Sequence, residues 1–136
     1  MQLVRGELLP KWLQLHKEEK LVRKVLSDVL EQCWRSDSIS LDHGELSKAP
    51  KHLIIDSNQK PWIVDFETAS VIRKPANVTS ICQFLFIGGS KVARMIAESI
   101  GNVNRREIID RLRLYKNNKT RENFNAVYQS CLFQII

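Results

Sequence analysis

Residues 43–67 read HGELSKAPKHLIIDSNQKPWIVDFE. Within this stretch, residues 52–56 and 61–65 form two short runs that are mostly apolar and β-branched, and residues 57–60 between them favour a turn. Pro61 is acceptable at the first position of a strand, where its missing N–H costs little. The pattern predicts a β-hairpin, and the nearly continuous apolar character of both runs indicates that the hairpin packs against helices.

The predicted hairpin brings a histidine and an aspartate together. If the turn is centred on the middle of its four residues, Asp56 pairs with Pro61, and each further step moves both strands by one residue. His52 then lies opposite Asp65, where paired side chains are close neighbours. Glu45 belongs to the loop before the first strand. We therefore expect an acid, a histidine and a second acid near the open end of the hairpin.

The rest of the chain has the pattern of helices. Apolar residues recur at three- and four-residue steps within residues 17–35, which predicts a long amphipathic helix. Residues 77–136 are also predicted to be helical, and Ser90, Asn104 and Thr120 can each cap a helix at its N-terminus. The fold class predicted is therefore mainly α, of the α+β type, with one small β-hairpin.

Composition limits the class of protein. A chain of 136 residues with 43% apolar residues is long enough for one domain, and the net charge of +6 permits a phosphate-bearing partner. Cys33, Cys82 and Cys131 are odd in number and lie among apolar residues, which favours buried free thiols and a reducing compartment. The longest apolar run, Ile81–Ile87, is too short to span a bilayer. We expect a cytoplasmic protein without a membrane anchor.

The order of the motifs resembles protein-kinase-like phosphotransferases, and most closely the compact archaeal predicted serine/threonine kinases related to the RIO and Bud32 groups. Residues 43–46 look like the H-G-D-L form of the catalytic loop, residues 51–56 like an N-I-L-I-D stretch, and residues 63–67 like the I-D-F-G metal segment. The resemblance covers roughly residues 3–90 and implies a kinase-like C-terminal lobe.

The resemblance also implies a division of the chain, taken as one domain over residues 1–136. The expected parts are a hinge-like segment at 1–16, the long helix at 17–35, a catalytic-loop-like segment with the hairpin at 36–67, and a helical remainder at 77–136.

In the family, the acid of the catalytic loop positions the attacking hydroxyl group, and a metal neutralises charge on the transferred phosphoryl group. By resemblance, Glu45 is the catalytic acid, and His43 is the other member of the catalytic loop, which it steadies. Asp65, His52 and Glu67 would hold the metal, and the cofactors would be ATP with Mg²⁺ or Mn²⁺. The nitrogen of His52 suits Mn²⁺ or Zn²⁺ better than Mg²⁺.

These roles predict a lobe of a serine/threonine protein kinase, with a protein hydroxyl group as the substrate. The five glycines form no G-x-G-x-x-G, so we expect the chain to be inactive or nearly so alone, and to need a companion chain that supplies an N-terminal lobe. Two alternatives stay open. One is a non-catalytic, kinase-derived binding or assembly module, including a homo-oligomer, and the other is a basic nucleic-acid-binding domain.

Overall fold

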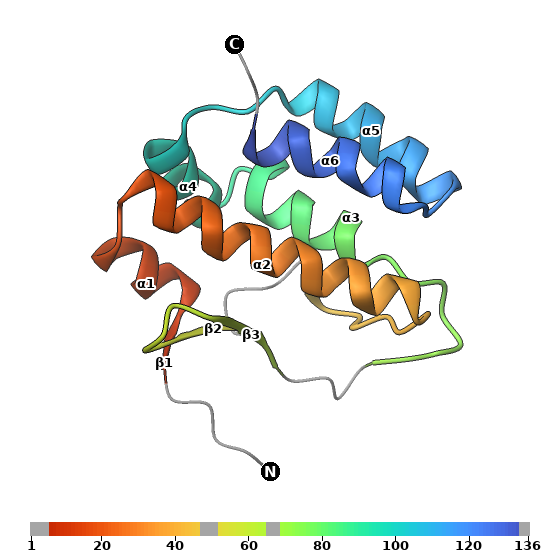
Figure 1. Ribbon diagram of the computed structural model, residues 1–136, viewed down its shortest axis with the longest axis horizontal. Coiled ribbons are helices and arrows are strands. Elements are labelled where there is room, and N and C mark those ends of the chain that lie inside the picture. Colours follow the sequence, from red (N-terminus) through yellow and green to blue (C-terminus); the bar gives the residue numbers. More distant parts are fainter. Residues whose placement is uncertain (1–5, 47–51, 65–68, 134–136) are drawn as a thin grey trace.

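The computed structural model describes residues 6–46, 52–64 and 69–133. Within them the chain is mainly helical with a small antiparallel sheet, which confirms the coarse prediction (Figure 1). The strands are β1 (Gly6–Leu8), β2 (Leu53–Asp56) and β3 (Pro61–Ile63). The helices are α1 (Leu9–Leu15), α2 (Glu19–Ser38), α3 (Asn77–Cys82), the π-helix η2 (Gln83–Ile87), α4 (Lys91–Ile100), α5 (Arg105–Asn117) and α6 (Arg121–Leu132).

Helix α2 is the long helix predicted from the apolar repeat, and it is the centre of the fold. It contacts α3, α4, α6 and β3, with the sheet on one side and the α5–α6 pair on the other (Figure 1). Its apolar stripe, which includes Val25, Leu26 and Leu30, is completely buried. Burial of each such side chain stabilises the fold by about 1.5–3 kcal/mol. Packing of this stripe therefore fixes where both ends of α2 lie.

The three helix caps predicted from the sequence are all present. Side-chain oxygens of Ser90, Asn104 and Thr120 accept hydrogen bonds from backbone N–H groups three residues later, at 3.0, 3.1 and 3.1 Å. Each bond satisfies a donor that the first turn of a helix leaves unpaired. Polar residues next to apolar repeats thus located the starts of α4, α5 and α6 correctly.

The sheet is larger than the predicted hairpin. Strand β1 pairs with β2 in antiparallel fashion, with Gly6 opposite Asp56, so the strand order is β1-β2-β3. Gly6 is required there because a Cβ atom at this position would collide with the carbonyl group of Ile55. The prediction of a two-stranded hairpin was therefore incomplete, because the short segment before α1 has little strand character of its own.

The register of the hairpin differs from the prediction by one residue. Ile55, not Asp56, lies opposite Pro61, and Leu53 lies opposite Ile63. The turn is shorter than expected, because the Asp56 N–H donates to the Lys60 carbonyl and Gln59 has a positive φ of 61°. A three-residue loop with a left-handed third residue has this geometry, and glycine is usual at that position. A glutamine gave no such signal in the sequence.

The cysteines behave as predicted. Cys33, Cys82 and Cys131 are all buried and free, and burial raises the pKa of the Cys33 and Cys131 thiols well above the ordinary value. Thiols of this kind are poor nucleophiles. Among the described residues, no helix combines the length and the apolar character that crossing a membrane would require.

Candidate active site

The loop that carries Glu45 begins where α2 ends. Ser40 has a positive φ of 61°, its N–H donates to the Asp37 carbonyl, and the Leu41 N–H donates to the Ser36 carbonyl. This pair of bonds is the Schellman motif, which closes a helix and turns the chain sharply away from its axis. The turn directs residues 41–46 back toward the sheet, so the end of α2 determines where the loop starts.

A buried carboxylate holds this turn against the next helix. Asp37 Oδ1 accepts hydrogen bonds from the backbone N–H and the side-chain Nδ2 of Asn77, both at 2.9 Å. Its other oxygen accepts the Tyr115 hydroxyl at 2.6 Å. Asp37 is 4% exposed, and buried carboxylates of this kind need several donors to be tolerated. The three residues come from α2, α3 and α5 and form the node that we call the Asp37 cluster.

The Asp37 cluster extends into the loop through Asn77. The side-chain Oδ1 of Asn77 accepts a hydrogen bond from the His43 N–H at 2.8 Å, and its Nδ2 also donates to the Leu41 carbonyl. Asn77 is itself buried. A single amide therefore fixes two backbone positions of the loop relative to α3.

Asp42 fixes the same loop to the segment before α3. Its backbone exchanges two hydrogen bonds with Ser70, each 2.9 Å, and its carboxylate lies 3.1 Å from Arg73 Nε. The Ala76 N–H donates to the same carboxylate at 3.2 Å. Residues 70–76 thus lie beside the loop.

His43 uses its ring to join the loop to the sheet. Its Nδ1 accepts from the Glu45 N–H at 3.3 Å, and its Nε2 lies 2.9 Å from the Val64 carbonyl, to which it can donate. These two bonds together require the neutral tautomer with the proton on Nε2. His43 is buried, and its geometry fits the predicted role of steadying the loop rather than a direct exchange of protons with a substrate.

His52 lies next to both residues of the loop, although the predicted pairing was wrong. The Val64 N–H donates to the His52 carbonyl, so Val64 and not Asp65 is its cross-strand partner. The His52 ring is fully buried, its Nε2 lies 3.4 Å from Glu45 Oε2, and its centroid lies 5.0 Å from that of His43. The structure therefore brings His43, Glu45 and His52 together.

The other two predicted site residues, Asp65 and Glu67, lie outside the described residues. In the part of the chain that is described, no group of three His, Cys, Asp or Glu side chains is arranged to hold a metal ion. Glu45 and His52 alone offer one carboxylate and one enclosed imidazole. That set does not suit Mg²⁺, which prefers oxygen ligands and keeps several of its waters.

The basic residues of the C-terminal half divide into two kinds. Arg111 donates to the Ala126 carbonyl and pairs with Glu107, and Arg121 makes a two-pronged ion pair with Glu31. These arginines hold helices together. In contrast, no hydrogen bond or ion pair within the described ranges involves the side chains of the exposed residues Arg94, Arg105, Arg106 and Arg113.

Sequence reasoning missed Asp37, Asn77 and Tyr115. One signal was available, because an aspartate in the last turn of a helix interacts unfavourably with the negative end of the helix dipole. An acid kept at such a position indicates a specific donor elsewhere in the fold. No signal in the sequence indicates that the donors belong to α3 and α5.

The chain is similar to an archaeal protein. This chain is 29% identical over 100 residues to an uncharacterized protein of Methanocaldococcus jannaschii. The alignment covers 74% of this chain and 83% of that protein. No family model matches the chain. The kinase-like resemblance of residues 43–67 stays a prediction.

Proposed function

We propose that the chain is a protein-kinase-like lobe that transfers the γ-phosphoryl group of ATP to a serine or threonine hydroxyl of a protein. The observation that carries the proposal is the Glu45–His52 pair, with 3.4 Å between the carboxylate and the ring nitrogen. The Glu45 side chain is 34% exposed, whereas that of His52 is fully enclosed. A carboxylate that is about one-third exposed, with a buried histidine behind it, is suited to act on a substrate that arrives from solvent.

In this proposal Glu45 positions the attacking hydroxyl group and accepts its proton. As the hydroxyl oxygen bonds to the γ-phosphorus, the bond from that phosphorus to the leaving ADP oxygen breaks. His52 orients the carboxylate, and His43 keeps the loop against the sheet. Fixing a reacting group in this way lowers the entropic part of the activation barrier.

A divalent cation, when bound, would neutralise charge on the transferred phosphoryl group. By resemblance its ligands are Asp65 and Glu67. His52 is assigned a positioning role instead, because its Nε2 faces Glu45 and its ring is fully enclosed. This assignment leaves the oxygen ligands, which hard cations prefer, to the two acids.

The test is transfer of labelled γ-phosphate from Mg-ATP or Mn-ATP to a library of serine- and threonine-containing peptides. The chain is used in excess over ATP, because we expect slow transfer without a companion lobe. Glu45→Gln keeps the size of the side chain but removes the base, and should slow transfer by about 100-fold or more. Glu122→Gln, on the exposed first turn of α6, is the matched control and should have no effect.

His52 is tested with a conservative and a disruptive variant. Glutamine offers a nitrogen donor near the position of Nε2, so His52→Gln should keep most of the transfer, whereas His52→Leu should lose about tenfold. Equal loss in both variants would contradict a positioning role. Transfer that does not differ between the unmodified chain and Glu45→Gln would reject the proposed role of Glu45. Transfer that is absent even with the chain in excess would favour the non-catalytic binding module.

A basic nucleic-acid-binding domain is the second candidate, and it is favoured by the exposed arginine side chains that pair with no other described residue. Arg111 is unsuitable for testing it, because that side chain joins α5 to α6. The informative variant reverses charge at Arg105, Arg106 and Arg113. Salt-sensitive binding of single-stranded RNA that this variant loses would support the second candidate, and no binding at low salt would remove it.

A further inference from the structure

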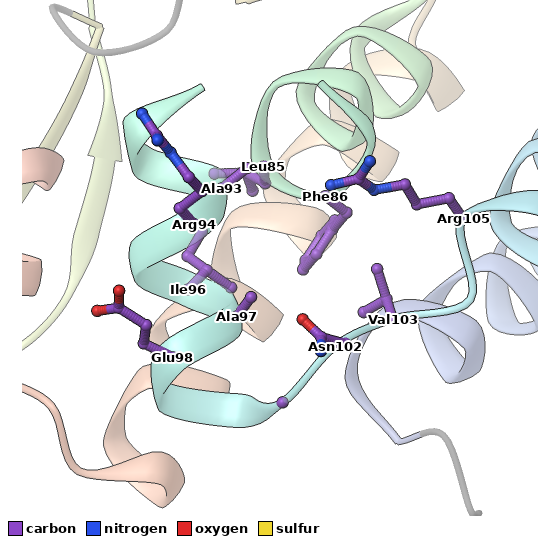
Figure 2. A pocket seen from close by; sticks show the side chains of 11 residues that line it. Leu85, Phe86, Ala93, Arg94, Ile96, Ala97, Glu98, Asn102, Val103 and Arg105 are labelled. Atoms are coloured by element: carbon purple, nitrogen blue, oxygen red, sulfur yellow. The ribbon is translucent and has the colours of Figure 1, made fainter. Parts of the chain in front are cut away.

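A pocket of about 660 Å³ lies between η2, α4 and the segment that leads into α5 (Figure 2). None of its lining residues belongs to the loop of Glu45 or to the sheet. Its volume falls within the range of small-molecule sites, roughly 300–1,000 Å³. The pocket therefore requires an explanation separate from the proposed phosphotransfer.

The floor of the pocket is apolar. Leu85 and Phe86 come from η2, Ile96 from α4, and Val103 from the following segment. The Phe86 ring projects toward the hollow in Figure 2. Gly101, with a φ of 94°, allows the chain to turn back after α4 so that Val103 closes the far side. An apolar body of ring or chain type fits such a floor.

The wall from η2 has an uncommon backbone. Residues 83–87 form a π-helix, and the Gly88 N–H donates to the Gln83 carbonyl at 2.7 Å. Single π-turns within helices are rare and occur frequently at functional sites. Here the wider turn contributes Phe86, which packs as part of the core and also lines the pocket.

The rim of the pocket carries a cation, Arg105. Arg105 extends over the Phe86 side of the pocket, whereas Arg94 and Glu98 point away on the outer side of α4 (Figure 2). Within the described ranges the Arg105 side chain makes no hydrogen bond or ion pair, unlike those of Arg23, Arg111 and Arg121. Arg105 is also the first residue of α5, where the helix dipole adds positive potential.

We propose that this pocket binds a small organic anion with an apolar body. The body packs on Phe86, Ile96 and Val103, and the carboxylate, sulfate or phosphate group pairs with Arg105. A guanidinium group binds such anions through two parallel hydrogen bonds, which gives orientation as well as affinity. The site is independent of Glu45 and His52, so either proposal can fail without the other.

The test compares 2-naphthoate with 2-naphthamide, which has nearly the same shape and no charge. Binding is followed by shifts of backbone amide signals in NMR titrations. Naphthoate should bind at least about fivefold more tightly than naphthamide, with the largest shifts at residues 85–105. Equal binding of both compounds, or shifts confined to other regions, would overturn the proposal.

Two variants and one control identify the contacts. Arg105→Ala should weaken the binding of naphthoate by about five- to tenfold and the binding of naphthamide by less than about twofold. Arg106→Ala changes the neighbouring arginine, which does not line this pocket, and should leave both compounds unaffected. Ala97→Leu places a larger side chain in the hollow without harming α4, so both compounds should be excluded. Naphthoate that binds Arg105→Ala as well as the unmodified chain would also overturn the proposal.

Discussion

The side-chain oxygen of Asn77, at the start of α3, accepts a hydrogen bond from the backbone N–H of His43, 2.8 Å away and 34 residues earlier. The same amide donates from Nδ2 to the buried carboxylate of Asp37. The loop of the candidate active site is thus held by a side chain that takes no part in the proposed chemistry.

Asn77→Ala should destabilise the fold by about 2–3 kcal/mol, because it removes donors and an acceptor from buried partners. Asn77→Asp keeps an acceptor for His43 but places a second carboxylate beside Asp37, so the loss should be larger still. Urea denaturation measures both. Asn125→Ala, at an exposed position of α6, is the control and should change the free energy of unfolding by less than about 0.5 kcal/mol. An aspartate variant as stable as the alanine variant would contradict the proposed role of the amide.

Tyr115→Phe should cost about 1.5–3 kcal/mol, because it removes the hydroxyl donor from Asp37 and leaves one carboxylate oxygen with fewer partners. The ring itself remains in contact with Trp34 and Phe124, so packing should be preserved. Thermal and urea unfolding, with near-ultraviolet circular dichroism as the control for packing, measure the loss. A change below about 0.5 kcal/mol would mean that the hydrogen bond contributes little.

The same tyrosine predicts a dependence on alkaline pH. Burial and the hydrogen bond to Asp37 raise the pKa of Tyr115 above its ordinary value of 10.0. Above about pH 10 the unfolded chain therefore loses this proton while the folded chain keeps it, so the free energy of unfolding falls as pH rises. Tyr115→Phe lacks this term, and its stability should fall less steeply between about pH 9 and pH 11. If the free energy of unfolding fell equally steeply with pH in Tyr115→Phe and in the unmodified chain, the raised pKa of Tyr115 would be contradicted.

Ser40→Gly should stabilise the fold by about 0.5–1 kcal/mol, because Ser40 has a left-handed backbone that glycine adopts without strain. The residue is exposed, and its backbone N–H rather than its side chain closes the end of α2. Ser38→Gly, two residues earlier and still helical, is the matched control and should destabilise. Loss of stability in Ser40→Gly would contradict the Schellman geometry.

Gly6→Ala should separate β1 from β2, because the added Cβ would meet the backbone of Ile55. A clash with backbone cannot be relieved by a change of rotamer, so a loss of about 1–3 kcal/mol is expected. Gly89→Ala has no atom within contact distance of its Cβ and should be nearly neutral. Glu7 lies opposite Ile55, and hydrogen exchange of the Glu7 and Ile55 amides reports on the pairing of the strands. Unchanged protection in Gly6→Ala would contradict the pairing.

Asp56→Asn should lower the melting temperature near neutral pH. In acid, the melting temperatures of the variant and the unmodified chain should become equal. Hydrogen bonds from the Trp62 indole and from the Lys60 and Asn58 N–H groups hold the pKa of Asp56 below its ordinary value of 3.8. The stabilising contribution is therefore present above about pH 4 and is lost as pH falls through the lowered pKa. Melting curves between about pH 2 and pH 6 test this, and a gap that stays constant would contradict it.

The helices could be predicted because their signals are local. The apolar repeat of α2 and the caps of α4, α5 and α6 depend on residues a few positions apart. The register of the hairpin could not be predicted, because a single residue with a left-handed backbone, Gln59, decides the length of the turn. A shift of one residue changes which side chains share a face of the sheet. The expected pairing of His52 with Asp65 failed for this reason.

Part of the candidate site could also be predicted. The motif order pointed to His43, Glu45 and His52, and the structure places their side chains together, with Val64 as the cross-strand partner of His52. The Asp37 cluster could not be foreseen, since its bonds join residues 40 and 78 positions apart. Contacts over such separations depend on how whole helices pack, which no local pattern records.

The Asp37 cluster also has a consequence for how the chain unfolds. Its carboxylate is buried, and its donors come from α3 and α5, so a partly folded form without α5 would leave one oxygen without its hydroxyl partner. Such forms are costly, because a desolvated carboxylate with too few donors raises their free energy. Opening of the C-terminal helices and release of the loop should therefore occur together. Amides of α5 and of residues 41–43 would then exchange with solvent at one common rate, as a single cooperative unit.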